Sequence, residues 1–208
     1  MTEQREASED AVMTRIGQAV ILLHAGDREE ARNRLGDIWS EIGEEGDFLH
    51  RCTLAHYMAD AQDDPADELA WDLRALTAAE ALRARPQPGE GPGPGVGPQS
   101  GDGPEPGPGP SPEPGARSRD ARRADAEPHL AMRVFYPSLH LSLAADYVKL
   151  RRPDAARTHL ARARAATAAL ADDGYGNGVR AAIARLERRL AAEPDPGPDP
   201  RPFPEQSP

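Results

Sequence analysis

A segment made almost entirely of proline and glycine constrains this chain most, because it separates two parts that must fold around it. Residues 86–115 contain 11 prolines and 10 glycines among 30 residues, without the strict three-residue period of collagen. The segment contains almost no apolar side chains, so burial cannot offset the entropy lost on ordering it. We therefore expect residues 86–115 to form a disordered linker. Residues 194–208 have a similar composition and are expected to form a disordered tail. The foldable parts are therefore 1–85 and 116–193.

The composition of these two parts predicts helices. Ala, Leu, Arg and Glu predominate in both, and these residues lose little side-chain freedom in a helix. Aromatic residues make up only 4% of the chain, and no run alternates bulky apolar with polar side chains as a half-buried strand would. The sequence therefore predicts an all-α protein.

Apolar spacing and capping residues divide the two parts into three helical hairpins and a closing helix. The expected helices cover residues 9–25, 27–42, 47–62, 65–85, 128–152, 153–170 and 177–190. The short connections between paired helices predict antiparallel hairpins.

Several helix ends carry specific signals. Asp27 and Glu30 have the spacing of a capping box, in which each side chain bonds the backbone N–H of the other residue. Asp64 is an expected N-cap, with Pro65 in the first helical position. Two further boundaries are less determined: Pro137 either kinks its helix or starts a new one, and Asn177 is expected to cap the last helix.

The segment SLAADYVKLRRPDAARTHLARA resembles a tetratricopeptide repeat. Leu143, Ala144 and Tyr147 match the large, small and aromatic positions of the first helix of that repeat. The small, large and small positions of its second helix are matched by Ala156, Leu160 and Ala163. The first hairpin, ILLHAGDREEARNRLGDI, is similar, whereas the middle one, LAHYMADAQDDPADELAWDLRAL, departs from the pattern in its longer turn.

The chain as a whole resembles actinobacterial proteins described only as tetratricopeptide-repeat proteins, and its Arg-rich composition with one lysine suits a GC-rich genome. That resemblance implies an α-solenoid of about three hairpins plus a closing helix, since a single hairpin cannot bury its apolar face alone. It also implies a groove lined by the first helix of each pair. The expected function is a protein-interaction or scaffolding module that binds a partner peptide or helix in this groove, with no cofactor and no enzymatic activity.

Charge is divided unequally between the two foldable parts. Residues 1–85 hold 9 Arg against 19 Asp and Glu, a net charge of −10, whereas residues 116–193 hold 15 Arg and Lys against 9 Asp and Glu, a net charge of +6. We expect the two parts to attract each other and to pack as one solenoid, the alternative being that the basic part faces an acidic partner. The overall charge of −10 argues against binding nucleic acid or an anionic membrane.

The sequence predicts a cytoplasmic protein. No segment approaches the roughly 20 apolar residues that cross a bilayer, and the acidic first residues are unlike a secretory signal. Cys52 is the only cysteine, so no disulfide can form within the chain.

Two sets of residues are candidates for a functional site. The candidates for lining a peptide-binding groove are His56, Asp60, His140 and Lys149. The alternative is a metal-dependent or ligand-sensing helical protein, whose ligands would be His50, Cys52, His56 and Asp60. The last three of these residues are four apart, so they share one helix face, which is the spacing that brings zinc ligands together.

Overall fold

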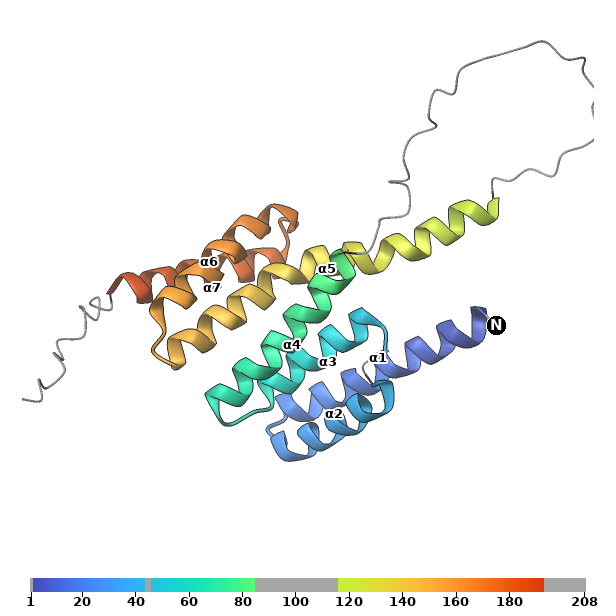
Figure 1. Ribbon diagram of the computed structural model, residues 1–208, viewed down its shortest axis with the longest axis horizontal. Coiled ribbons are helices and arrows are strands. Elements are labelled where there is room, and N and C mark those ends of the chain that lie inside the picture. Colours follow the sequence, from blue (N-terminus) through green and yellow to red (C-terminus); the bar gives the residue numbers. More distant parts are fainter. Residues whose placement is uncertain (1, 44–45, 85–115, 193–208) are drawn as a thin grey trace, which may run out of the picture.

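The computed structural model describes residues 2–43, 46–84 and 116–192, and Figure 1 shows their helices stacked in chain order. The elements are α1 (Thr2–His24), α2 (Arg28–Ile42), α3 (Phe48–Asp60), α4 (Pro65–Arg83), α5 (Ala116–Lys149), α6 (Pro153–Ala166), the short 3₁₀ helix η1 (Thr167–Ala169) and α7 (Gly174–Ala192). Since these residues form helices and no strand, the all-α prediction is confirmed for the part of the chain that is described. The linker 86–115 and the tail 194–208 lie outside it.

The first hairpin uses half of the predicted capping box. The Asp27 carboxylate accepts a hydrogen bond from the backbone N–H of Glu30 at 3.4 Å, so Asp27 caps α2 as expected. The Glu30 carboxylate does not complete the box but accepts from Arg34 at 2.7 Å. The reason is that the N–H of Asp27 already donates to the carbonyl of Leu22 at the end of α1.

The second hairpin begins α4 as the sequence predicts. The Asp64 carboxylate accepts from the backbone N–H groups of Ala66 at 2.7 Å and Asp67 at 3.3 Å, and Pro65 occupies the first helical position. Asp47 caps α3 in the same way by accepting from Leu49 and His50. Both caps satisfy N–H groups that have no partner within their own helix.

Helix α5 runs without interruption through Pro137, so the alternative in which Pro137 starts a new helix is wrong. A proline inside a helix costs about 3 kcal/mol, because it removes a backbone hydrogen bond and crowds the preceding turn. Here Pro137 is fully buried, and α5 packs against both α4 and α6. Burial on both sides of α5 outweighs the local cost.

Helix α7 begins before Asn177, and Asp173 is its capping residue instead. The Asp173 carboxylate accepts from the N–H of Gly176 at 2.8 Å, and its carbonyl accepts from the N–H of Asn177 at 3.0 Å. The Asn177 side chain accepts from Arg180 within the helix. Asp173 supplies the same kind of acceptor as Asn177 one turn earlier, so the helix gains that turn.

Two helices start well before the first residue that apolar spacing indicates. Helix α1 begins at Thr2 rather than residue 9, and α5 begins at Ala116 rather than residue 128. In Figure 1 the first turns of α5 extend beyond the neighbouring helices. The extra turns consist mostly of polar residues with good helix propensity, which extend a helix without producing an apolar pattern.

The helices pack in a regular order. Each helix contacts the next one in the chain, and the first helices of successive pairs, α1, α3, α5 and α7, also contact their neighbours in that series. Among the described residues the second helices, α2, α4 and α6, make no contact with one another. Helix α5 therefore forms the floor of the space between α4 and α6.

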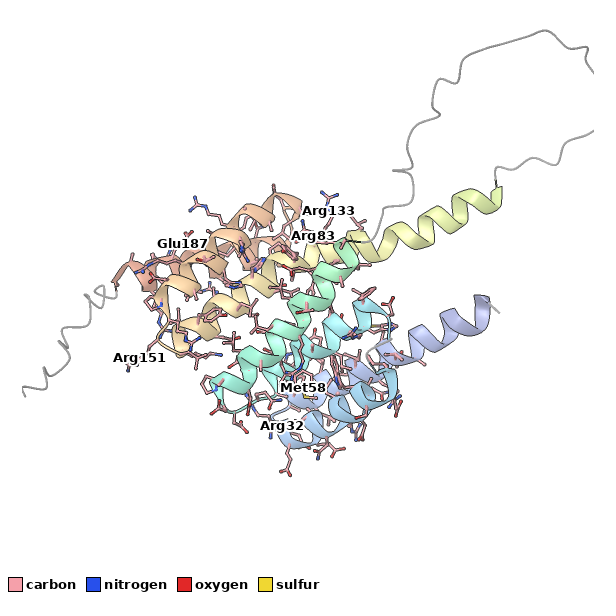
Figure 2. The ribbon with its side chains drawn as sticks, viewed as in Figure 1. Arg32, Met58, Arg83, Arg133, Arg151 and Glu187 are labelled. Carbon is pink, nitrogen blue, oxygen red and sulfur yellow. The ribbon has the colours of Figure 1, made fainter. Side chains whose placement is uncertain are left out.

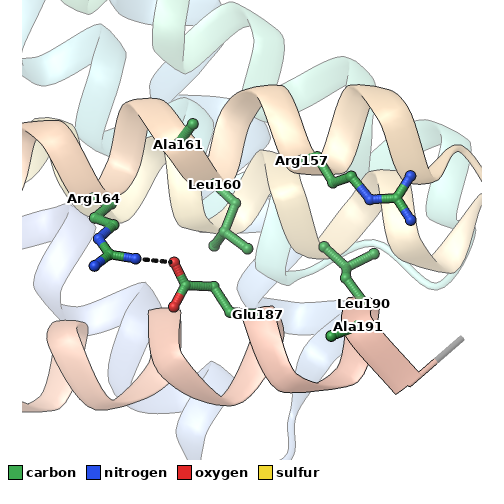
Figure 3. Close-up of a pocket in the computed structure, with 7 residues that line it drawn as sticks. All are labelled: Arg157, Leu160, Ala161, Arg164, Glu187, Leu190 and Ala191. Atoms are coloured by element: carbon green, nitrogen blue, oxygen red, sulfur yellow. Dashed lines mark hydrogen bonds and ion pairs between the residues drawn. The ribbon is translucent and has the colours of Figure 1, made fainter.

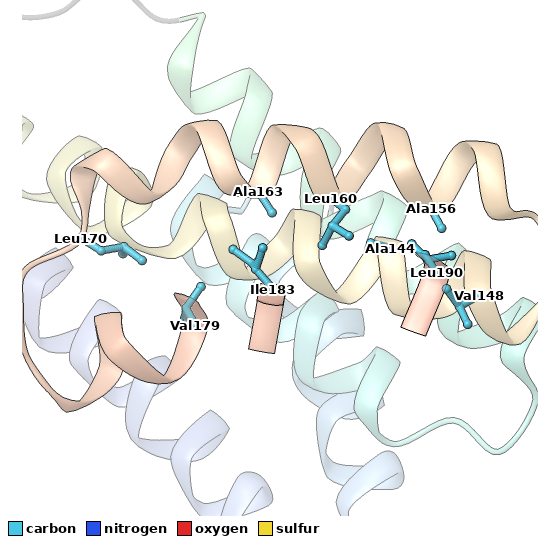
Figure 4. Packing of buried hydrophobic residues seen from close by; sticks show 9 residues of the cluster. All are labelled: Ala144, Val148, Ala156, Leu160, Ala163, Leu170, Val179, Ile183 and Leu190. Atoms are coloured by element: carbon cyan, nitrogen blue, oxygen red, sulfur yellow. The ribbon is translucent and has the colours of Figure 1, made fainter. Parts of the chain in front are cut away.

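Buried apolar side chains hold this stack together. Figure 4 shows the cluster shared by α5, α6 and α7, in which Leu160, Ile183 and Leu190 meet. A second cluster joins α4 to α5 through Leu69, Leu76 and Leu143. Each large side chain of this kind contributes about 1.5–3 kcal/mol by leaving water.

The apolar faces expected to join the two parts of the chain are mostly in contact. Leu69, Leu76, Leu139 and Leu143 are buried, and Tyr147 packs partly buried against the same cluster. Leu73 was expected on this face as well but is 39% exposed. It lies one helical turn from Leu69 and Leu76, yet the crossing of α5 over α4 does not cover it.

Candidate functional site

Charged side chains from three helices meet where α3 and α4 contact α5. We call this group the charged seam, and its members are His56 and Asp60 of α3, Glu68 and Asp72 of α4, and Asp146 and Lys149 of α5. Three of the four residues expected to line a binding groove, His56, Asp60 and Lys149, belong to it. From the sequence, Glu68 and Asp72 were interpreted as carboxylates at a solvated helix end, and Asp146 was not considered as a site residue.

His56 and Asp72 form the inner end of the charged seam. The Nδ1 atom of His56 lies 3.1 Å from Oδ1 of Asp72, whose side chain is only 3% exposed. Burial lowers the pKa of His56, but the hydrogen bond and negative charge of Asp72, with a further contribution from Asp60, raise it above its ordinary value. The Phe135 ring packs against the imidazole in an edge-to-face contact, with the ring centroids 5.2 Å apart.

Asp146 and Lys149 of α5 form the other side of the charged seam. Lys149 Nζ lies 2.5 Å from Oε1 of Glu68 and 3.3 Å from Oδ1 of Asp146. Burial and the neighbouring carboxylates of Asp72 and Glu68 raise the pKa of Asp146 to about 8, against the opposing effect of Lys149. Asp146 therefore keeps its proton to a higher pH than an ordinary aspartate does. The contact between Lys149 and Glu68 links residues 81 positions apart.

The residues of the alternative metal site have different surroundings. Cys52 is fully buried, and its Sγ atom faces the Met132 sulfur at 3.8 Å within an apolar cluster. Burial raises the pKa of the Cys52 thiol to about 12, whereas a zinc ligand must be a thiolate. Within the described ranges, no three His, Cys, Asp or Glu side chains lie close enough together to hold a metal ion.

His140 lies apart from the charged seam, on the far side of α5. Its Nδ1 atom is 3.0 Å from Nδ1 of His159 on α6, and its ring packs edge to face against Tyr136 at 4.6 Å between centroids. Burial, followed by the charges of His159, Arg162 and Arg83, lowers the pKa of His140 to about 4. Both imidazoles are neutral at pH 7, because burial and Arg162 also lower the pKa of His159.

His140 forms part of the floor of a groove of about 630 Å³ between α4 and α6. We call it the arginine groove, and it is lined by Glu80 and Arg83 of α4, Arg133, Tyr136 and His140 of α5, Arg162, Ala165 and Ala166 of α6, and Ala168 and Ala169 of η1. Figure 2 shows Arg83 and Arg133 at the same corner of the molecule, where the end of α4 meets α5. The Arg83 guanidinium lies over the Tyr136 ring, 4.6 Å from its centroid.

The arginine groove differs from the groove that the repeat resemblance implies. It lies between second helices, α4 and α6, over the first helix α5, rather than along a row of first helices. No pattern in the sequence indicated this groove. Arg83, Arg133 and Arg162 come from three helices and are brought together only when α5 crosses α4.

A second groove, of about 560 Å³, lies between α6 and α7 (Figure 3). Its walls are Leu160 and Leu190 with the aliphatic stem of Arg157. The Arg164 guanidinium donates to Glu187 across it at 3.1 Å, so the charges of this groove are already paired. It is the less polar of the two and carries no unsatisfied buried group in the described structure.

Comparisons with protein-family models, with curated proteins and with solved structures found no match to this chain. In the described residues, no helix has the combination of length and apolar character that a membrane span requires.

Proposed function

We propose that this protein is a protein-interaction module, a short tetratricopeptide-like solenoid that binds a segment of a partner protein in the arginine groove. The observation that carries the proposal is the groove itself. Its volume of about 630 Å³ falls within the roughly 300–1,000 Å³ of ligand sites. Residues from both foldable parts of the chain line it, so the ligand would contact the acidic and the basic part together.

The order of helix contacts supports the solenoid. In stacked hairpin repeats each unit contacts only its neighbours, and one helix of each pair forms a continuous inner layer. Helices α1, α3, α5 and α7 contact one another in series, while α2, α4 and α6 are separated from one another in the described structure. The proposed assembly is three hairpins closed by α7, as the resemblance implies.

The chemistry of the groove suits binding better than catalysis. Arginine stays protonated at neutral pH, so it donates hydrogen bonds but does not act as a general base. His140 is neutral and buried, and its Nδ1 is already engaged with His159. These groups hold and orient a ligand, and the alanines of α6 and η1 provide an apolar wall beside them.

Of the four residues expected to line a groove, we therefore retain His140. We assign His56, Asp60 and Lys149 to the contact between α3, α4 and α5. His56 pairs with Asp72 and Lys149 pairs with Glu68, whereas Asp60 interacts with the same cluster through charge alone.

Peptide display against the immobilised full chain tests the proposal. Ala165 is exposed on α6 and lines the arginine groove, so Ala165→Trp fills it with an indole ring. Ala161 is also exposed on α6 but lines the other groove, so Ala161→Trp is a matched control of the same size and helix propensity cost. We expect selected peptides to bind the wild type and Ala161→Trp equally, and to lose binding to Ala165→Trp.

Two outcomes would reject the proposal. Failure to enrich any sequence family, both in this display and in a library of covalently modified peptides, would remove the evidence for peptide binding. Peptides that bind Ala165→Trp normally but not Ala161→Trp would place the binding site between α6 and α7 instead. Circular dichroism of both variants would verify that their helical content is unchanged.

A further inference from the structure

The arginine groove contains an excess of positive charge that no carboxylate in the described residues neutralises. Arg83, Arg133 and Arg162 make no ion pair there, although Glu80 lies on the same wall. Elsewhere in the fold, arginines such as Arg32 and Arg164 pair with a carboxylate. Three arginines against one glutamate leave a net charge of +2 on the groove, with both histidines neutral.

A buried polar atom points to a ligand at the same place. His140 is fully buried, and its Nε2 atom has no hydrogen-bond partner among the described residues. A buried polar atom without a partner costs about 1–3 kcal/mol, so such atoms in folded proteins usually have one. His140 lines the groove, so an acceptor there, either a ligand or an ordered water, can supply this partner when the side chains that cover Nε2 shift.

The His140–His159 pair determines what Nε2 can offer. The two Nδ1 atoms are 3.0 Å apart, so in a neutral pair one of them carries the shared proton and donates it to the other. When His159 donates, the proton of His140 is on Nε2, and this atom becomes a donor. An acceptor in the groove stabilises that tautomer, since it supplies the missing partner.

We propose that the arginine groove binds a phosphorylated side chain of a partner peptide, with Arg83, Arg133 and Arg162 around the phosphate and His140 Nε2–H donating to it. This inference rests on the proposed function and names the class of partner for the same groove. A phosphoserine or phosphothreonine carries about −1.5 to −2 charges at neutral pH, which matches the net charge of the groove. Its three terminal oxygens also accept more of the available N–H donors than a carboxylate does.

The size of the groove favours a peptide over a free phosphate ion. A water molecule occupies about 30 Å³, so a groove of about 630 Å³ holds a phosphate together with several residues of the chain that carries it. The apolar wall of Ala165, Ala166 and Ala169 contacts those flanking residues rather than the phosphate. A free ion would leave most of the groove unfilled.

Oriented peptide libraries with a fixed central residue and degenerate flanks test the inference on the full chain. The central residue is phosphoserine, phosphothreonine, serine or glutamate in parallel arms, and inorganic phosphate forms a further arm. We expect retention of a phosphorylated library only, weakened at least about tenfold by Arg133→Gln or Arg162→Gln, since each removes a charge-assisted contact. Arg157→Gln, on α6 but lining the other groove, is the matched control and should bind normally.

Nitrogen NMR of the histidine rings gives a second readout that a general loss of stability would not produce. Binding of the retained phosphopeptides should move the His140 ring to the form protonated at Nε2, and Arg133→Gln should weaken this change. Equal retention of the glutamate library would overturn the phosphate assignment. Binding of inorganic phosphate with no retained library would overturn the peptide assignment, leaving an adventitious ion only.

The two proposals fail in different ways. If display yields peptides that Ala165→Trp blocks, yet no phosphorylated library is retained, the groove binds peptides without a phosphate and this inference is wrong. If neither experiment yields a ligand, both the phosphate inference and the proposed function are wrong.

Discussion

Replacing Asp146 by asparagine should make the stability of this protein less sensitive to pH. Asn has nearly the shape of a protonated Asp but cannot ionise. In the folded chain burial and the carboxylates of Asp72 and Glu68 raise the pKa of Asp146 to about 8, whereas in the unfolded chain it ionises near pH 3.8. The folded state is therefore penalised progressively as pH rises from about 4 to about 8, because it retains a proton that the unfolded state releases.

The magnitude follows from this difference. Each pH unit between the two pKa values corresponds to about 1.4 kcal/mol, which gives an upper limit of about 4 kcal/mol at pH 7. The nearby Lys149 ammonium is 42% exposed, so solvent screens part of the cluster, and we expect about half of this limit, or about 2 kcal/mol. Asp146→Asn should thus be about as stable as the wild type near pH 4 and about 2 kcal/mol more stable near pH 7.

Urea unfolding followed by far-UV circular dichroism measures this difference at about pH 4, 5.5, 7 and 8.5. Asp154→Asn is the control, because Asp154 is a highly exposed aspartate that pairs with Arg157 on the surface. The effect of Asp154→Asn on stability should be small at every pH. A difference between Asp146→Asn and the wild type that stays constant over the whole range would refute the reasoning, as would a variant that is less stable at pH 8.5.

Three further predictions concern the packing of the two parts. Leu143→Ala should reduce the free energy of unfolding by about 2–5 kcal/mol, whereas the same change at the exposed Leu73 should cost less than about 1 kcal/mol, as urea unfolding will measure. The Cys52 thiol should resist a thiol-specific reagent in the native protein and react rapidly in urea, because it is buried and its pKa is about 12; fast native labelling would contradict its placement. Fragments 1–85 and 116–193, expressed separately and then mixed, should form a one-to-one complex in analytical ultracentrifugation, and added salt should weaken it. Two folded fragments that do not associate at low salt would contradict the joint packing.

Local signals predicted the helices well, because they act within a few residues. Asp27, Asp47 and Asp64 mark helix starts through side-chain acceptors that reach only the next turn. The same kind of reasoning failed at Asn177, where Asp173 competes for the same role and lies further from the apolar pattern. It left two alternatives open at Pro137, because burial against α4 and α6, a tertiary effect, decides whether the helix continues.

The candidate site was predictable only in part. His56 and Asp60 share a helix face, so their proximity could be read from their spacing. That spacing could not show that the face meets Asp72 and Asp146 or that Cys52 lies in an apolar cluster. The arginine groove depends on the angle at which α5 crosses α4, and helix periodicity does not determine a crossing angle.

Lys149 is the only lysine in the 208 residues, so a reaction with lysine side chains would modify this position alone. Burial lowers the pKa of its amine, but the hydrogen bond and charge of Glu68, together with Asp146, raise it above the ordinary value. The amine is therefore protonated and a slow nucleophile, although its side chain is 42% exposed and a reagent or acyl-transferring enzyme can approach it. Acylation of this one nitrogen would remove the positive charge that pairs with Glu68 of α4 and would change the hydrogen bond to Asp146 of α5. A single covalent mark would thus act on the joint between the two parts of the chain rather than on the surface of either one.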